Sequence, residues 1–164
     1  MELVDVVKQR VSVRDYLEKE VSLDLLKELV YAAMEAPSGK NLRPLRFVII
    51  TKKETLEKVK TSSPYSQYNA PAAILVVADT AKSPSLWVDD GGAATEHILL
   101  RAVDLGLGTV WCGVHNVADR DQKIKEIIPH KEGEIFYSLI LVGYPKEKKN
   151  KLGRVDESKL SIIA

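Results

Sequence analysis

Three side chains near the N-terminus, Arg10, Ser12 and Arg14, have the types and the spacing needed to bind an elongated anion. If this segment is extended, alternate side chains point to opposite faces, so these three share one face while Val11 and Val13 can anchor in a core. At about 3.3 Å per residue, the two arginines then lie roughly 13 Å apart. A guanidinium offers planar, permanently charged donors for phosphate oxygens and polar ring edges. The alternative interpretation is a solvated strand edge.

Other reactive residues do not form a catalytic or metal-binding pattern. Cys112 and His115 are three positions apart, which puts them on opposite faces of a continuous strand, and no further ligands cluster with them. Nothing nearby in the sequence indicates the lowered pKa that a nucleophilic thiol needs. His97 shares a polar helix face with Arg101 and Asp104, which favours a surface or interface role. We therefore expect no metal site and no catalytic side chain.

Size and charge restrict the possible classes of protein. A chain of 164 residues with 45% hydrophobic and 29% charged residues is expected to form a single domain spanning 1–164. The net charge of +1 favours no nucleic-acid partner, and no apolar run approaches the roughly 20 residues that span a bilayer. A single cysteine fits a reducing compartment, so we expect a cytoplasmic protein without a membrane partner.

Apolar periodicity and helix-ending residues predict the elements that position these side chains. Asp90 is expected to cap one helix, and Gly106 to end it. The polar extension 145–164 is expected to wrap a partner subunit. The alternation of helices and strands favours an α/β or α+β sandwich. We expect helices over 2–9, 23–35, 53–60, 90–105 and 119–128, and strands over 46–51, 72–78, 108–114 and 135–142.

Six short segments, spread in order over the whole chain, resemble the nitroreductase family of FMN-dependent flavoproteins. No dinucleotide-binding glycine motif or phosphate-binding P-loop competes with this assignment. The segments are 10–16 (RVSVRDY), 36–41 (APSGKN) with Pro44, 90–94 (DGGAA), 106–111 (GLGTVW), 143–145 (GYP) and 154–157 (RVDE).

The resemblance implies an α+β fold with a mainly antiparallel sheet flanked by helices, and an intertwined homodimer with FMN at the subunit interface. The first segment would hold the FMN phosphate and, through Arg14, the pyrimidine edge of the flavin. Residues 37–41 would reach in from the second subunit, the end of the strand at Cys112 and Gly113 would approach flavin N5, and Arg154 would return to the phosphate. The implied cofactor-binding residues are Arg10, Val11, Ser12, Arg14, Pro37, Ser38, Gly39, Asn41, Trp111, Cys112, Gly113 and Arg154.

The same resemblance implies an NAD(P)H oxidoreductase that reduces nitroaromatic compounds, quinones or similar acceptors by ping-pong hydride transfer. The flavin carries this chemistry, which fits the lack of a catalytic side-chain cluster. Two alternatives stay open: a flavoenzyme dedicated to one metabolite, and a non-catalytic module that stores or senses FMN. Tyr65, Tyr68 and Trp87 lie in expected loops, where they either line a substrate slot or make packing and dimer contacts.

Overall fold

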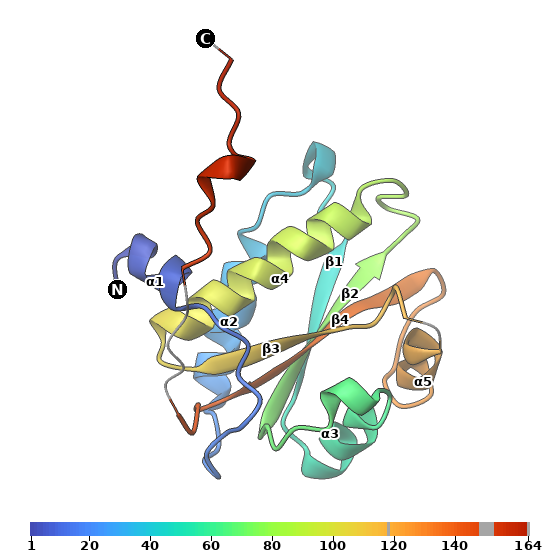
Figure 1. Cartoon of the computed structure of the whole chain (residues 1–164). Helices are drawn as coiled ribbons and strands as arrows, with labels where there is room; N and C mark the ends of the chain where they lie inside the picture. Colours follow the sequence, from blue (N-terminus) through green and yellow to red (C-terminus); the bar gives the residue numbers. More distant parts are fainter. Residues whose placement is uncertain (118, 148–152, 164) are drawn as a thin grey trace.

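A four-stranded antiparallel sheet lies at the centre of the computed structural model, which describes residues 1–117, 119–147 and 153–163. The strand order is β1-β2-β4-β3, and Figure 1 shows the helices on both sides of the sheet. This confirms the predicted α+β class and its mainly antiparallel sheet. The strands are β1 (Leu45–Ile50), β2 (Ala72–Asp79), β3 (Gly108–Gly113) and β4 (Glu134–Gly143).

Helices cover the two faces of the sheet unequally (Figure 1). On one face lie α2 (Leu23–Met34) and the long α4 (Trp87–Asp104), with α1 (Leu3–Gln9) packed against α4. On the other lie the shorter α3 (Lys53–Lys60) and α5 (Arg120–Lys125). Within the described ranges, no helix has the length and apolar character needed to cross a bilayer.

The interior strands explain why the sequence shows continuous apolar runs there. In β2, Ala73, Leu75 and Val77 belong to the core under α3 and α5. The intervening Ile74 and Val76 belong to the core under α2 and α4. A strand covered on both faces buries every side chain, so it reads as a continuous hydrophobic run without alternation.

Residues 12–16 pair with the start of β3 and then with the residues that follow β4. Ser12 forms a parallel bridge with Thr109, and the Val13 amide donates to the Thr109 carbonyl at 2.9 Å. The buried Tyr16 hydroxyl donates to the Val13 carbonyl at 2.6 Å. Gly108 is required here, because a Cβ would meet Val13 Cγ2 at 2.7 Å. The extended conformation predicted for this segment is thus confirmed.

Two predicted helix boundaries were wrong. Helix α4 begins at Trp87, so Asp90 lies within its first turn and does not cap it; its carboxylate is used by a distant loop instead. Helix α5 ends at Lys125 rather than 128, and the Ile127 amide then makes a tighter i to i+3 bond to the Ile124 carbonyl ahead of Pro129. Gly106 does end α4, with a φ of +73° that favours glycine.

The C-terminal segment 153–163 projects away from the body of the protein (Figure 1). All of its residues are exposed, including the apolar side chains of Val155, Leu160, Ile162 and Ile163. Among the described residues, its hydrogen bonds are all internal. Of the extension predicted to wrap a partner, residues 148–152 and 164 lie outside the described residues.

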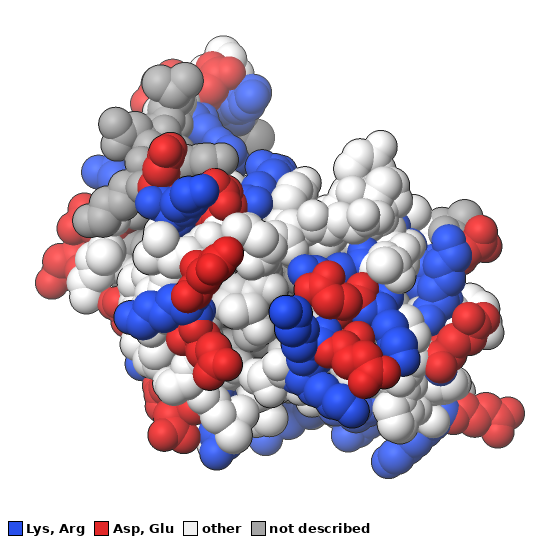
Figure 2. Space-filling model, turned by 90° about the horizontal axis from the view of Figure 1, so that it is seen from below, with Lys and Arg blue, Asp and Glu red and all other residues white. Residues whose placement is uncertain are grey.

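Charges of both signs are interspersed on the underside of the molecule (Figure 2). Helix α3 contributes ion pairs of Lys58 with Glu54 and of Lys60 with Glu57, each at 2.8 Å. The Lys58–Glu54 pair is exposed, and such pairs contribute little to stability, with a typical value of about 0–1 kcal/mol. Lys60 is buried and also donates to the Tyr68 carbonyl at 2.8 Å.

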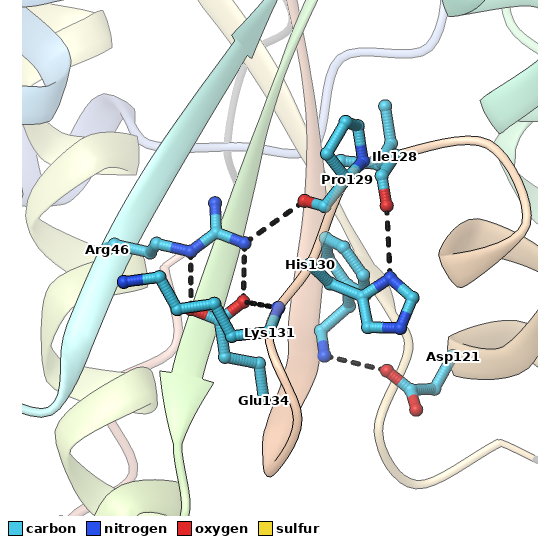
Figure 3. Close-up of polar contacts among 8 residues, drawn as sticks. Arg46, Asp121, Ile128, Pro129, His130, Lys131 and Glu134 are labelled. Carbon is cyan, nitrogen blue, oxygen red and sulfur yellow. Dashed lines mark hydrogen bonds and ion pairs between the residues drawn. The ribbon is translucent and has the colours of Figure 1, made fainter.

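A stronger pair joins β1 to β4 across the intervening β2 (Figure 3). Arg46 donates through Nε and Nη2 to the two carboxylate oxygens of Glu134, each at 2.6 Å. The Lys131 amide also donates to Glu134, at 2.8 Å. Hydrogen bonding to Arg46 lowers the pKa of the Glu134 carboxyl to about 2. The fork geometry and the burial of Glu134 make this pair a structural clamp.

We expect Glu134→Gln to lower the free energy of unfolding by about 1–3 kcal/mol at pH 7, because it replaces charge-assisted hydrogen bonds with neutral ones. Since the folded-state pKa of Glu134 lies below the ordinary value of 4.5, its contribution is present above that pH and is lost as pH falls toward 2. The difference between wild type and variant in urea denaturation should therefore shrink over this range. Glu132→Gln, an exposed neighbour, is the control; an equal effect there would contradict the clamp.

Candidate functional site

The edge formed by residues 10–14 and β3 brings together most of the predicted binding residues. Arg10 reaches toward α4, where its Nε lies 3.5 Å from Glu96 Oε1. Ser12 is half-buried beside β3, and Arg14 is exposed. Val11 packs against the core under α3 and α5, in line with its predicted anchoring role. Among the described residues, Arg14 has no ion pair, so its donors are free for a ligand.

Successive residues of β3 point to opposite faces of the sheet. Trp111 is partly exposed and lies near Tyr137, with ring centroids 6.0 Å apart. Cys112 is buried on the other face, where its thiol donates to the Tyr65 carbonyl at 3.4 Å. The Gly113 carbonyl accepts a hydrogen bond from Arg120 Nη1.

Cys112 has the properties of a packed thiol. Burial raises its pKa to about 11, although Arg120 and Arg14 act in the opposite direction. His115 stacks on Tyr137, which belongs to the core under α2 and α4, so it lies on the face away from Cys112. In the part of the chain that the structure describes, no group of three or more His, Cys, Asp or Glu side chains could hold a metal ion.

The predicted loop 37–41 lies at the N-terminal end of α4 and is held there by Asp90. The Gly39 amide donates to Asp90 Oδ1 at 2.7 Å, and the Ser83 hydroxyl contacts Oδ2 at 3.4 Å. Asp90 is 4% exposed, so this carboxylate is an internal anchor. Leu86 packs so closely that a Cβ on Gly39 would meet its Cδ1 at 2.2 Å.

The loop is strained as well as anchored. Lys40, Asn41 and Arg43 have φ values of 52°, 54° and 49°, in the left-handed region that non-glycine residues rarely adopt. The Ser38 hydroxyl accepts from the Arg43 amide at 3.0 Å, which stabilises this conformation. Next to the loop is a cavity of about 300 Å³, lined by Ala33, Met34, Ala36, Pro37, Ser38, Arg43, Pro44, Leu45 and Phe47.

Helix α4 connects the two parts of the candidate site. Asp90 holds the loop, and Glu96, six residues further along, contacts Arg10. At 1.5 Å per residue, these contacts lie about 9 Å apart along the helix. That the loop completes the site of a second subunit stays a prediction.

Four other predicted residues are not brought together in this chain. Arg154 lies in the projecting tail. Tyr65 is 70% exposed beside Cys112, whereas Tyr68 packs against the core under α3 and α5. Trp87 makes edge contacts with His115 and Tyr137 on the opposite side of the sheet. Trp87 thus packs on the face of α2 and α4, whereas Tyr68 packs on the face of α3 and α5. That these residues line a substrate slot stays a prediction.

Sequence reasoning did not anticipate the placement of two buried charged residues beside the candidate site, Asp90 and Arg120. For Asp90 the sequence offers a signal, because an acidic residue precedes an apolar helical stretch, but its contact with the distant Gly39 amide is not visible in the sequence. Arg120 carried none, because an arginine in a short polar helix is normally solvated. His97 proved half-buried, with Nδ1 2.9 Å from the Ala32 carbonyl, and links α4 to α2.

Comparison with known proteins identifies the family. A Methanothermobacter thermautotrophicus protein with the provisional name NADH dehydrogenase/NAD(P)H nitroreductase is 38% identical over 151 residues, which cover 90% of this chain and 79% of that protein. The model of the Nitroreductase family matches residues 7–66. This chain belongs to the nitroreductase family.

Solved structures of the family agree over the full chain. A Clostridium acetobutylicum protein, provisionally named an NADH oxidase, is 36% identical with a TM-score of 0.91, covering 96% of this chain and 98% of its own. An FMN-dependent nitroreductase from Clostridium difficile R20291 is 30% identical with a TM-score of 0.90, covering 97% and 98%. The nitroreductase fold predicted from the sequence is therefore confirmed.

We expect Asp90→Ala to free the loop from α4. The Gly39 amide would lose its buried acceptor, at a cost on the order of 1–3 kcal/mol, so its hydrogen exchange should accelerate about tenfold or more. Amide exchange followed by NMR measures this directly. Asp89→Ala removes an exposed carboxylate from the same turn and should leave Gly39 unchanged. Unchanged exchange at Gly39 in Asp90→Ala would contradict the anchoring role.

Proposed function

We propose that this protein is an FMN-dependent NAD(P)H oxidoreductase that reduces nitroaromatic compounds, quinones or similar acceptors by a ping-pong scheme. The observation that carries the proposal is the row of donors on Arg10, Ser12 and Arg14, held along β3 next to the exposed Trp111. The names of two relatives support it: one is an NAD(P)H nitroreductase by provisional name, and the other is an FMN-dependent nitroreductase.

The donor set fits FMN in both charge and reach. Arg10 Nε lies 3.5 Å from Glu96 Oε1, and the guanidinium carries further donors that could bind a phosphate. The Ser12 hydroxyl adds a neutral donor at the same edge, and Arg14 offers a full guanidinium to the carbonyl edge of the ring. When bound, FMN supplies the hydride chemistry, and the protein orients and tunes it.

The protein residues would act mainly through position and charge. Arg10 and Ser12 would fix the phosphate end, while Arg14 would hold positive charge beside the ring, where it favours the negatively charged reduced form. The raised pKa of the Cys112 thiol keeps it protonated at neutral pH, so it takes no part as a base or nucleophile. Donor and acceptor would occupy the same open face in turn.

The deciding experiment is anaerobic addition of NADH or NADPH to the purified, FMN-loaded protein. We expect NADH or NADPH to reduce the bound flavin once, so that its visible absorption bleaches in a stopped-flow measurement. The absorption should return when a quinone is added. Arg10→Ala should weaken FMN binding about tenfold or more, because it removes a charge-assisted phosphate contact. A flavin that neither nucleotide reduces would identify a storage module and end the proposal.

We further propose that the active form is a homodimer in which loop 37–41 of one subunit completes the site of the other. The support is the exposed apolar surface of the projecting tail, together with apolar side chains exposed on α1 and α2, including Leu3, Tyr31 and Met34. Burying such surface against a second copy would remove a cost of exposure. The anchored, strained loop is suited to presenting Ser38 and Asn41 rigidly to a partner.

A mixing experiment tests the shared site. The double variants Ser38→Ala/Asn41→Ala and Arg10→Ala/Arg14→Ala should each bind FMN poorly. Heterodimers formed from both should regain one FMN site per dimer. In that site the arginines of one subunit and the loop of the other are all unaltered. Two affinity tags allow the heterodimer to be isolated before titration. A verified heterodimer without recovery would show that each site is built from a single chain.

A further inference from the structure

We propose that Arg120 is a second cationic group of the flavin site, which acts with Arg14 to stabilise the negative charge of the reduced FMN ring. This inference rests on the proposed function. It adds to the flavin site a residue that the sequence resemblance does not imply. Arg120 lies at the start of α5, a helix that the binding motifs do not include.

The burial of Arg120 without a carboxylate partner is the central observation. The residue is 8% exposed, and among the described residues it makes no ion pair. Its one hydrogen bond from the guanidinium goes to the Gly113 carbonyl. Buried charges are usually paired with an opposite charge, because removing them from water costs several kcal/mol in typical cases (about 3–5 when a partner is deleted). An unpaired one indicates an anionic ligand.

The groups around Arg120 do not neutralise it. Tyr65 lies with its ring centroid 5.8 Å from Cζ, which gives a cation–π contact without a negative charge. The nearby Cys112 thiol stays neutral, because burial raises its pKa to about 11. The positive charge of Arg120 is therefore uncompensated within the described residues.

The position of Arg120 is fixed and coincides with the end of β3. The adjacent Asp121 accepts from the Phe136 amide at 2.7 Å, which ties α5 to β4 (Figure 3). The bond to Gly113 then places the guanidinium next to the stretch 111–113. Arg120 and Arg14 both lower the pKa of Cys112 against the effect of burial, so both cations lie within electrostatic range of this strand end.

The ligand that fits two fixed cations at this strand end is one that gains negative charge during the reaction. Hydride transfer adds two electrons and one proton, so the reduced ring carries one net negative charge that the oxidised ring lacks. Positive groups held within about 10 Å of the ring would favour that state by Coulomb attraction in a partly desolvated site. A carboxylate on an acceptor is the other possible occupant, and the experiment separates the two.

The test compares the affinities of the apoprotein for oxidised FMN and for dithionite-reduced FMN under anaerobic conditions. We expect Arg120→Gln to weaken binding of the reduced form about tenfold more than binding of the oxidised form, as loss of one charge at this range implies. For a two-electron couple this tenfold change corresponds to a midpoint potential lower by about 30 mV. Arg120→Lys keeps the charge and should restore most of the preference.

Lys123→Gln is the matched control, because it removes an exposed charge from the same helix and should leave the affinity ratio unchanged. Arg120→Met is a second neutral variant whose apolar stem suits the buried position if the glutamine variant fails to fold. Equal weakening for both redox forms would overturn the inference and leave Arg120 as a support for Gly113.

Three further outcomes separate this inference from the proposed function. Benzoate binding to the oxidised holoprotein that depends on Arg120, with an unchanged redox preference for FMN, would assign the cation to an anionic acceptor and overturn the flavin role. Wild-type protein that binds neither form of FMN would instead end the proposed function itself. The third outcome is a wild-type protein that binds FMN and is bleached by NADH or NADPH, with an Arg120→Gln variant that shows the same ratio of affinities for reduced and oxidised FMN. This outcome would end the present inference and leave the proposed function standing.

Discussion

The pairing of residues 12–16 with β3 is the constraint on which the candidate site depends. An edge strand exposes unpaired amides and carbonyls. Here the Val13 amide donates to the Thr109 carbonyl of β3, and the Leu17 amide donates to the Tyr144 carbonyl just after β4. Val13 and Tyr16 anchor the segment in the core, so the side chains between and before them cannot turn inward. One set of contacts therefore protects the sheet edge and holds Arg10, Ser12 and Arg14 beside it.

Helix α4 is the second organising element, because it contacts both the segment and the loop. It can approach the sheet closely at Gly91, where a Cβ would meet the Tyr137 ring at 2.7 Å. Asp90 then holds Gly39 from its first turn, and Glu96 contacts Arg10 further along. In the proposed dimer, a single rigid helix would link a subunit's own site with the loop that it contributes to its partner.

Two buried charges of the described structure, Glu134 and Arg120, differ in how their charge is satisfied. Glu134 is matched by the Arg46 fork and a backbone amide, so its charge is satisfied inside the fold and its pKa falls. Arg120 has only a carbonyl and an aromatic ring beside it in the described structure. The paired charge of Glu134 stabilises the strand arrangement, whereas in our proposal the unpaired charge of Arg120 serves the bound flavin.

The sequence by itself determined the elements and the first half of the site. Apolar periodicity located each helix and strand, and the alternation of Arg10–Arg14 around two valines predicted the extended donor row, because both signals are local. Only the tertiary structure revealed the contact between Asp90 and Gly39, the burial of Arg120 beside Gly113, and the separation of Trp87 from Tyr65. Those depend on contacts between distant segments, such as Gly39 and Asp90, 51 positions apart, which a local pattern does not encode.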